Sequence, residues 1–484
     1  MTLLDRLGAA PRWAVLLTVA LAARAITFGN PILHVDEEFY FVTAHAMLDG
    51  ALPYVEIWDR KPIGLFLLYL PAALFGYPLG IWAYQAMALV AAVATSVLIG
   101  RLADRAGWSR GALFAGVAYL LWLNLFEGQG GQAPVFYNLP MVLAATLIAP
   151  GGPEDARRRF RRGLLAMLLV GIAIQLKYSA VFEGFFFGLW LLWREWRITR
   201  TALYTMLRGA AWAAVALLPT VAALGYYWLI GHTEAFVFAN FTSIALRNRD
   251  PAIELLGNLA EILLIGSPLI AMCVLAWRCR GGDPAARPVQ QWLFAWALAA
   301  LLGLLAFGSW FNHYALPLLV PGCACAAGFV AAHRSGMKVA LPLLVLLFLG
   351  GQALLIAKRA GRGTPAEFTA LADAVGSGPG CLHVYSGNTM LYVATGRCAR
   401  SAWRFPSHLG RTRERGAIGV SQSAELERIL AERPAMVVVR NAYRGERPEQ
   451  RARTLAAMND GYRLRAVRPL GDQQVAVFAR SEAR

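Results

Sequence analysis

Charge is scarce in this sequence. Only 15% of its 484 residues are charged, whereas 58% are hydrophobic, a composition far outside the range of soluble domains. Acidic residues are scarcer still, 29 against 46 basic ones, which gives a net charge of +17. The basic residues fall in short clusters between apolar runs and form no continuous patch, so they indicate membrane topology and not a nucleic-acid partner. The composition therefore predicts an integral membrane protein.

Two further features are missing. The first apolar run, residues 13–28, is followed by no small-residue cleavage site, so we interpret it as a signal anchor. The six cysteines show no zinc-like spacing, and the four in or beside apolar runs are expected to be inert small hydrophobes. Cys381 and Cys398 lie in the polar tail, where a disulfide and two free thiols are both open.

Long apolar runs are abundant, and about eleven of them approach the length that crosses some 30 Å of hydrocarbon. Residues 62–75 are shorter and contain Pro71, so we expect a helix in the membrane interface there. The expected spans are 12–28, 80–100, 111–127, 132–149, 164–177, 179–193, 208–231, 256–277, 290–309, 313–331 and 338–356.

The positive-inside rule sets the orientation. With the N-terminus in the cytoplasm, every predicted cytoplasmic loop carries excess arginine or lysine. Those loops are 101–110, 150–163, 194–207, 278–289 and 332–338. The same choice places on the outer face residues 29–79, 232–255, the turn at Asn312 and the tail. We thus predict an α-helical polytopic membrane domain, 1–356, and an extracytoplasmic C-terminal domain, 357–484.

The tail alternates short β-like runs with helix-like ones, which predicts a small α/β domain. The β-like runs are 382–385, 435–440, 462–467 and 474–479, and the helix-like runs are 367–375, 424–431 and 448–458. Ser423 precedes an acidic turn and marks the expected start of the middle helix.

The first outer loop concentrates charge directly after a predicted span. Asp36, Glu37 and Glu38 are followed about 25 residues later by Arg60, Lys61 and a proline. Charges held at a membrane surface are functional candidates. The alternative is a solvated loop in which Asp36 caps a helix.

Several short motifs of polar, aromatic and proline residues occur along the chain. They are Asp36-Glu37 with Tyr40, Gly50 with Pro53-Tyr54, Trp58 with Lys61-Pro62, Gln175-Leu176-Lys177-Tyr178, His313-Tyr314 with Leu316-Pro317 and Pro321, Tyr385-Ser386-Gly387 and Thr395-Gly396-Arg397. Taken together, these motifs resemble the GT-C superfamily of polyprenyl-phosphate-sugar glycosyltransferases, especially the branch of protein O-mannosyltransferases and lipid A aminoarabinose transferases, glycosyltransferase family 39-like. The resemblance covers most of the chain.

The resemblance implies an inverting transferase in the bacterial inner membrane with a periplasmic site. Its donor would be a polyprenyl-phosphate-linked sugar and its acceptor a lipid, glycan or protein. Such transfer needs a base for the acceptor hydroxyl and cations for the departing phosphate. Asp36 would be the base, assisted by Glu37. The phosphate would be contacted by Lys61, Lys177, His313 and, more weakly, Arg60. The substrate cavity would be lined by Tyr40, Tyr54, Trp58, Glu127, Asn138 and Tyr314.

One position departs from the family pattern. Asn138 stands where many relatives carry a second acid, and Glu127 upstream is a possible substitute. This departure counts against a metal-bridging or second-carboxylate role, so we predict no cofactor and leave a divalent cation as an open alternative. Lys61 and Lys177 have an alternative role as side chains that extend from helix ends to the interface. The alternative role of His313 is that of an interfacial histidine whose hydrogen bonds are satisfied.

Two rival functions remain at this point. A multi-span transporter or flippase for lipid-linked sugars also suits about eleven spans, although the charges gather at one face and the hydropathy shows no duplication. The other rival is a catalytically silent family member whose tail binds glycan or a partner protein.

Overall fold

The computed structural model describes residues 11–152, 154–279 and 284–481. The chain divides into two compact units. The first, here called the helical unit, comprises Met1–Ile26, Ala86–Ala222 and Pro251–Leu355. The second, here called the mixed unit, comprises Thr27–Gln85, Ala223–Asp250 and Ile356–Arg484.

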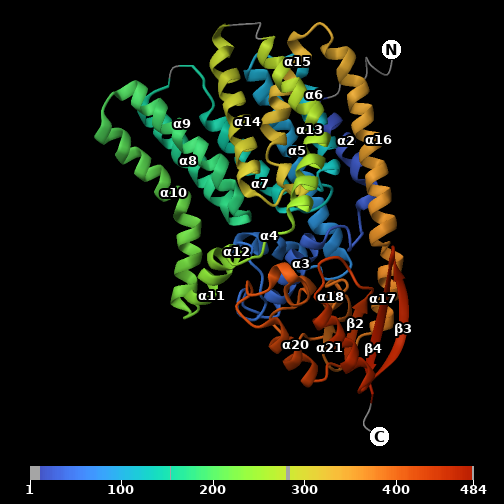
Figure 1. The fold of residues 1–484 in the computed structure, drawn as a ribbon. Coiled ribbons are helices and arrows are strands. Elements are labelled where there is room, and N and C mark those ends of the chain that lie inside the picture. The colour runs from blue at the N-terminus through green and yellow to red at the C-terminus, as the bar shows by residue number, and fades with distance from the viewer. Residues whose placement is uncertain (1–10, 153, 280–283, 482–484) are drawn as a thin grey trace. The chain divides into compact units, whose positions relative to one another are not determined.

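Each predicted span coincides with a helix (Figure 1). These helices are α2 (Arg12–Arg24), α5 (Leu79–Arg105), α6 (Ser109–Leu125), α7 (Ala133–Ile148), α8 (Ala156–Leu176), α9 (Val181–Thr199), α10 (Ala202–Leu229), α13 (Ala252–Arg278), α14 (Arg287–Phe307), α15 (Leu319–Ala332) and α16 (Gly336–Arg362). Short 3-10 turns occur at Ala25–Thr27, Tyr178–Ala180, Pro284–Ala286 and Asn312–Ala315.

The chain is a multi-pass membrane protein. Within the described ranges, five helical segments are long and apolar enough to cross a bilayer, and α7 and α15 are shorter apolar helices. On α10, Leu217, Leu218 and Val221 are each more than half exposed, as expected of side chains that face lipid. The count of eleven spans stays a prediction.

Two local features of the helical unit follow directly from sequence. Helix α8 ends at Leu176, Lys177 is extended, and α9 begins at Val181, so two helices meet at a turn as predicted. Gly111 of α6 packs against the backbone of Ala327 in α15, where an added Cβ would clash with the Ala327 carbonyl oxygen. Small residues permit this close approach of two membrane helices.

The mixed unit is built from shorter elements. Helix α4 (Ile63–Ala73) has 11 residues and contains Pro71. At 1.5 Å per residue it extends about 16 Å, too short to cross the hydrocarbon. The other helices are α3 (Val35–Leu48), α11 (Thr233–Val237), α12 (Ser243–Ala245), α17 (Pro365–Val375), α18 (Leu391–Thr395), α19 (Pro406–Gly410), α20 (Gln422–Ala431) and α21 (Pro448–Asn459), with a π-helix at Phe238–Thr242 and a 3-10 turn at Thr412–Glu414.

The tail contains the predicted sheet. Its strands are β1 (Leu382–Val384), β2 (Met436–Arg440), β3 (Tyr462–Leu470) and β4 (Gln473–Arg480), in the order β1-β2-β4-β3. Strands β1 and β2 are parallel, and β4 runs antiparallel to both β2 and β3. Helix α17 packs beside β3 (Figure 1).

All of the predicted strands and helices of the tail are present, and one boundary differs from the prediction. Helix α20 begins at Gln422, and its cap is Ser421, whose side chain accepts a hydrogen bond from the Ala424 amide. The expectation that Ser423 starts this helix is therefore wrong by two residues, because Ser421 already caps the first turn. Cys381 and Cys398 form a disulfide.

Candidate functional site

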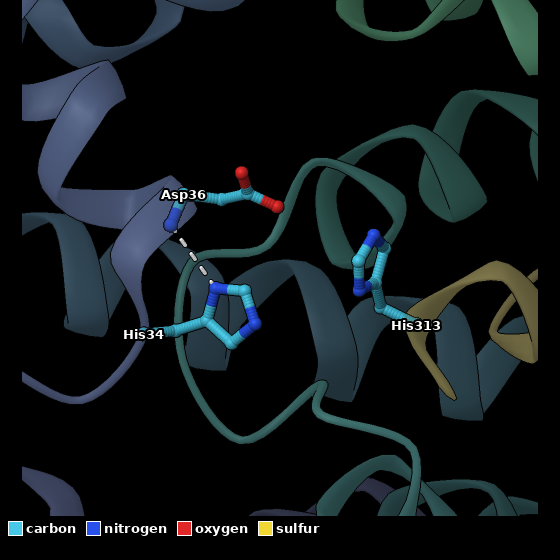
Figure 2. A group of neighbouring side chains, drawn as sticks. All are labelled: His34, Asp36 and His313. Carbon is cyan, nitrogen blue, oxygen red and sulfur yellow. Dashed lines mark hydrogen bonds between the residues drawn. The ribbon is translucent and has the colours of Figure 1, made fainter. Parts of the chain in front are cut away.

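The acidic cluster of the first loop forms the first turn of α3. His34 is the cap, in an extended conformation, and its Nδ1 accepts a hydrogen bond from the Asp36 amide at 3.1 Å (Figure 2). Asp36, Glu37 and Glu38 follow inside the helix, where its dipole favours negative charge. His34 therefore takes the capping role that the alternative interpretation gave to Asp36.

Asp36 and Glu37 differ in access. The Asp36 side chain is 18% exposed, whereas Glu37 is 0% exposed. Glu37 lies among buried tyrosines and interacts with Tyr84 and Tyr69. Of these two predicted catalytic carboxylates, Asp36 is the one a substrate can reach.

Lys61 lies beside Asp36. Its Nζ is 3.5 Å from the Asp36 carboxylate, 3.9 Å from that of Asp59 and 5.6 Å from the centre of the Tyr40 ring. The Tyr54 hydroxyl donates to the Lys61 carbonyl at 2.8 Å. The lysine side chain is 24% exposed, so its position is fixed from several sides while part of it remains accessible.

Arg60 has different partners from its neighbour. Its guanidinium lies 2.7 Å from the Glu414 carboxylate and donates to the Ser243 hydroxyl at 3.0 and 3.1 Å. It also stacks 5.2 Å from the Trp58 ring. These contacts join the first loop to two distant segments of the mixed unit, so they fit a tether better than a phosphate ligand.

Glu414 is the centre of that tether. Arg247 also contacts its carboxylate, at 2.9 Å. Burial alone would raise the pKa of Glu414, but Arg60 and Arg247 outweigh it and lower the pKa from 4.5 to about 2. Glu414 is therefore ionised at neutral pH.

Trp58 and Asp59 pack against a histidine from the tail. His408 Nε2 lies 3.8 Å from Asp59, and its ring meets the Trp58 ring edge-on at 4.7 Å. Burial lowers the pKa of His408 from 6.5 to about 4, against the attraction of Asp59. A neutral imidazole therefore supports the segment that carries Lys61.

Glu38 points toward the tail. Its side chain is 5% exposed and interacts with Asn388 and Arg362. Burial raises its pKa from 4.5 to about 8, and Arg362 only partly opposes that rise. Glu38 is thus mostly protonated at neutral pH, so its role differs from that of Asp36 two residues away.

The remaining predicted residues belong to the helical unit. Lys177 Nζ lies 4.4 Å from the centre of the Tyr314 ring. Both residues line a small cavity of about 20 Å³ with Tyr137, Ser179 and Glu183. The structure thus brings Lys177 and Tyr314 together, although they are far apart in sequence.

His313, also drawn in Figure 2, belongs to the helical unit. Its Nδ1 is 3.2 Å from the carboxylate of Glu127 in the same unit. Asn138 is buried and donates to the Tyr119 hydroxyl at 3.3 Å and the Leu316 carbonyl at 3.1 Å. These bonds give Asn138 a structural explanation, and its place in a substrate cavity stays a prediction.

No protein-family model and no curated protein matches this sequence. Solved structures do match. ArnT from Cupriavidus metallidurans bound to undecaprenyl phosphate aligns over 96% of this chain and 96% of its own, with a TM-score of 0.66 and 16% identity. The Archaeoglobus fulgidus oligosaccharyltransferase in the apo form aligns over 88% of this chain and 69% of its own, with a TM-score of 0.51 and 12% identity.

The chain has the GT-C fold. Both neighbours are GT-C glycosyltransferases, and the alignment to ArnT runs through nearly the whole chain, including the tail. The predicted fold class is confirmed. At these identities the likeness concerns the fold, and the chemistry depends on the side chains.

Several residues around the site escaped the sequence analysis. Asp59 lies between Trp58 and Arg60, both of which are candidate site residues from sequence. Its position in that motif was therefore the signal that could have identified it. His408, Glu414 and Arg247 carry no such local signal, because their partners lie more than 150 residues away in sequence. The GT-C resemblance assigned site roles only to residues of the predicted membrane domain, so it could not supply contacts made by the tail.

Proposed function

We propose that this chain is an inverting glycosyltransferase that moves a sugar from a polyprenyl-phosphate donor to an acceptor hydroxyl or phosphate. The reaction takes place at the periplasmic face of the bacterial inner membrane. The observation that carries the proposal is the pair formed by Asp36 and Lys61, 3.5 Å apart and both partly exposed.

The pair supplies the two kinds of group that the reaction needs. A carboxylate accepts the proton of the attacking hydroxyl, and an ammonium stabilises the negative charge that develops on the departing phosphate. Attack from the face opposite the phosphate inverts the anomeric carbon. Asp36 takes the first role because it is accessible, whereas Glu37 is buried among tyrosines.

The chain segments that make up the mixed unit support the prediction that the first two outer loops and the tail lie on the same side of the membrane. It contains Thr27–Gln85, Ala223–Asp250 and Ile356–Arg484, which include nearly all of the first two outer loops and the tail as predicted from charge. The Trp58 amide donates to the Ala402 carbonyl at 2.9 Å, and the Tyr227 hydroxyl donates to the Pro53 carbonyl at 3.1 Å. Segments that bond directly to one another lie on one side of a bilayer.

Lys177 and His313 take supporting roles in this proposal, as further cations for the phosphate. ArnT, whose fold this chain shares, has been solved with undecaprenyl phosphate bound, which supports a lipid phosphate as part of the donor.

Replacement of Asp36 tests the proposal. A deletion strain would be complemented with the wild type, Asp36→Asn or Lys61→Gln, and envelope lipids, glycans and proteins compared by mass spectrometry. We expect one sugar modification to disappear in the deletion strain and to stay absent with Asp36→Asn. Loss of a general base lowers a rate by roughly 10²- to 10⁴-fold.

The matched control is Asp373→Asn, which changes the same functional group on the exposed face of α17. It should restore the modification fully. A strain carrying Asp36→Asn at wild-type protein levels with an unchanged sugar profile would remove Asp36 from the mechanism.

A further inference from the structure

A second cavity lies within the mixed unit, at the opposite end of α3 from Asp36. Its volume is about 420 Å³, within the range of small-molecule sites. One wall contains His45, Asp49 and Glu56, and the facing wall comes from the tail and contains Gly396, Cys398 and Arg404. Neither wall takes part in the chemistry proposed above.

Arg404 is the charged residue of the tail wall whose donors are not used by the described residues around it. Its side chain is partly buried, and Nε is shielded from solvent. Among the residues that the structure describes, its guanidinium makes no hydrogen bond and no ion pair. A charged donor group without a protein partner is destabilising, and a ligand in the cavity that accepts from the guanidinium would offset this cost.

The neighbouring Arg397 shows what a structural arginine looks like here. Its guanidinium donates to the carbonyls of Gly376, Pro379 and Gly380 at 2.7 to 3.1 Å. It thereby holds the loop before β1, and its donors are used. Arg404 therefore differs from Arg397 in having donors left for a ligand.

The charged side chains that line the cavity restrict the chemical class of ligand that it can bind. Asp49 and Glu56 act electrostatically on Arg404. The Asp49 side chain is 72% exposed and pairs weakly with His45 at 3.5 Å. A phosphate dianion would be repelled by both carboxylates. A hydroxyl donates to a carboxylate and accepts from a guanidinium, so a polyhydroxylated ligand satisfies both kinds of group.

We propose that this cavity binds one saccharide unit that is neutral or carries an amino group. Arg404 donates to its hydroxyl oxygens, and Asp49 and Glu56 accept from its hydroxyl or ammonium groups. The proposal does not depend on the transfer reaction.

Its link to the reaction does rest on the proposed function. Asp36 and His45 are nine residues apart on one helix, which corresponds to about 14 Å along the axis. A glycan acceptor bound in the cavity would be anchored at this distance from the reacting hydroxyl. Binding energy from such remote contacts can be used at the reacting centre.

The test is saturation-transfer NMR on the full-length protein in detergent, with glucose, glucosamine and inorganic phosphate as probes. We expect both sugars to bind and phosphate not to displace them. Arg404→Gln should weaken binding of both sugars by at least about tenfold, because it removes charged hydrogen bonds. Asp49→Asn, on an exposed side chain, should weaken glucosamine more than glucose.

The control is Arg463→Gln, on the exposed part of β3, which should bind both sugars like the wild type. Equal binding by wild type, Arg404→Gln and Asp49→Asn would overturn the proposal, as would displacement of the sugars by phosphate. Asp36→Asn separates the two proposals, since it should abolish transfer and leave sugar binding intact. If Asp36→Asn transfers normally while Arg404→Gln has lost sugar binding, the cavity stands and the proposed mechanism falls.

Discussion

Replacement of His408 tests whether a neutral, buried imidazole supports the segment that carries Lys61. His408 is 2% exposed and packs against Trp58 and Asp59. Its pKa is about 4, lowered from 6.5 mainly by burial, and the charges around it are Asp59, Arg60, Glu414 and Lys61. In His408→Gln the side chain keeps a polar group but no longer titrates.

The direction of the pH dependence of stability follows from where the folded and unfolded chains bind a proton. Below about pH 6.5 the unfolded chain takes up a proton at His408, and the folded chain does so only near pH 4. The free energy of unfolding therefore falls as pH falls through this window. At about 1.4 kcal/mol per pH unit, the loss reaches roughly 3 kcal/mol for this one group.

The assay is thermal unfolding of the purified protein in detergent from pH 7.5 to 4. The difference in stability between wild type and His408→Gln should shift by up to roughly 3 kcal/mol in favour of the variant as the pH falls. His383 is the matched control, since burial also lowers its pKa to about 4 while it lies in β1. His383→Gln should show the same pH effect with unchanged transfer activity, whereas His408→Gln should also lower transfer. A pH-independent difference for His408→Gln would refute the reasoning.

Two further substitutions test buried carboxyls. Glu414→Gln should destabilise the protein by roughly 3 to 5 kcal/mol at pH 7, because Arg60 and Arg247 lose a buried counter-charge. Since the folded pKa of Glu414 is about 2 and the unfolded one 4.5, this deficit should shrink as pH falls between those values in the same thermal scan. Glu38→Gln should act in the opposite direction. Because the folded pKa of Glu38 is about 8 and the unfolded one 4.5, the wild type loses stability as the pH rises above 4.5. At pH 7.5 the free energy of unfolding of the variant should therefore exceed that of the wild type by up to roughly 4 kcal/mol, reduced by the lost attraction between Glu38 and Arg362.

These two predictions share one control variant, and each has a result that would contradict it. Glu432→Gln removes an exposed partner of Arg428 and should change stability by less than about 1 kcal/mol. Equal melting of Glu414→Gln and wild type at pH 7 would show that the tether contributes nothing. A Glu38→Gln variant that melts equally far below wild type at pH 5 and pH 7.5 would show that the glutamate is not protonated in the fold.

Local patterns in the sequence were enough for most of the fold. The strand at 436–440 and the helix at 448–459 were predicted within about one residue, because side-chain periodicity is a local property. The turn at Lys177 followed from a charge between two apolar runs. The span count is different, since crossing a bilayer depends on where the helix lies and not only on its length.

In the candidate site, too, residues with a local sequence signal were predicted and residues with distant partners were not. Asp36 and Lys61 were selected because their motif resembles that of a known superfamily, and the structure places them 3.5 Å apart. The support from His408 and Glu414 was not predictable, because each lies more than 300 residues from the loop it contacts and no periodic pattern connects them. Buried titratable groups with distant partners become visible only in three dimensions.

The basic pair of the first loop shows why adjacent residues of like charge need not share a role. Arg60 is an arginine because a planar guanidinium can meet Glu414 and the Ser243 hydroxyl at once. Lys61 offers a compact charge on a flexible stem, and it lies between two carboxylates, Asp36 and Asp59. The contacts of Arg60 hold the loop in place, and they thereby fix Lys61 beside the two carboxylates, where the proposed donor phosphate would replace one of them. Exchange of the two residues would keep the net charge but lose both sets of contacts, since a lysine cannot make the forked contact and an arginine beside Asp36 would hold the proposed base in a bidentate pair.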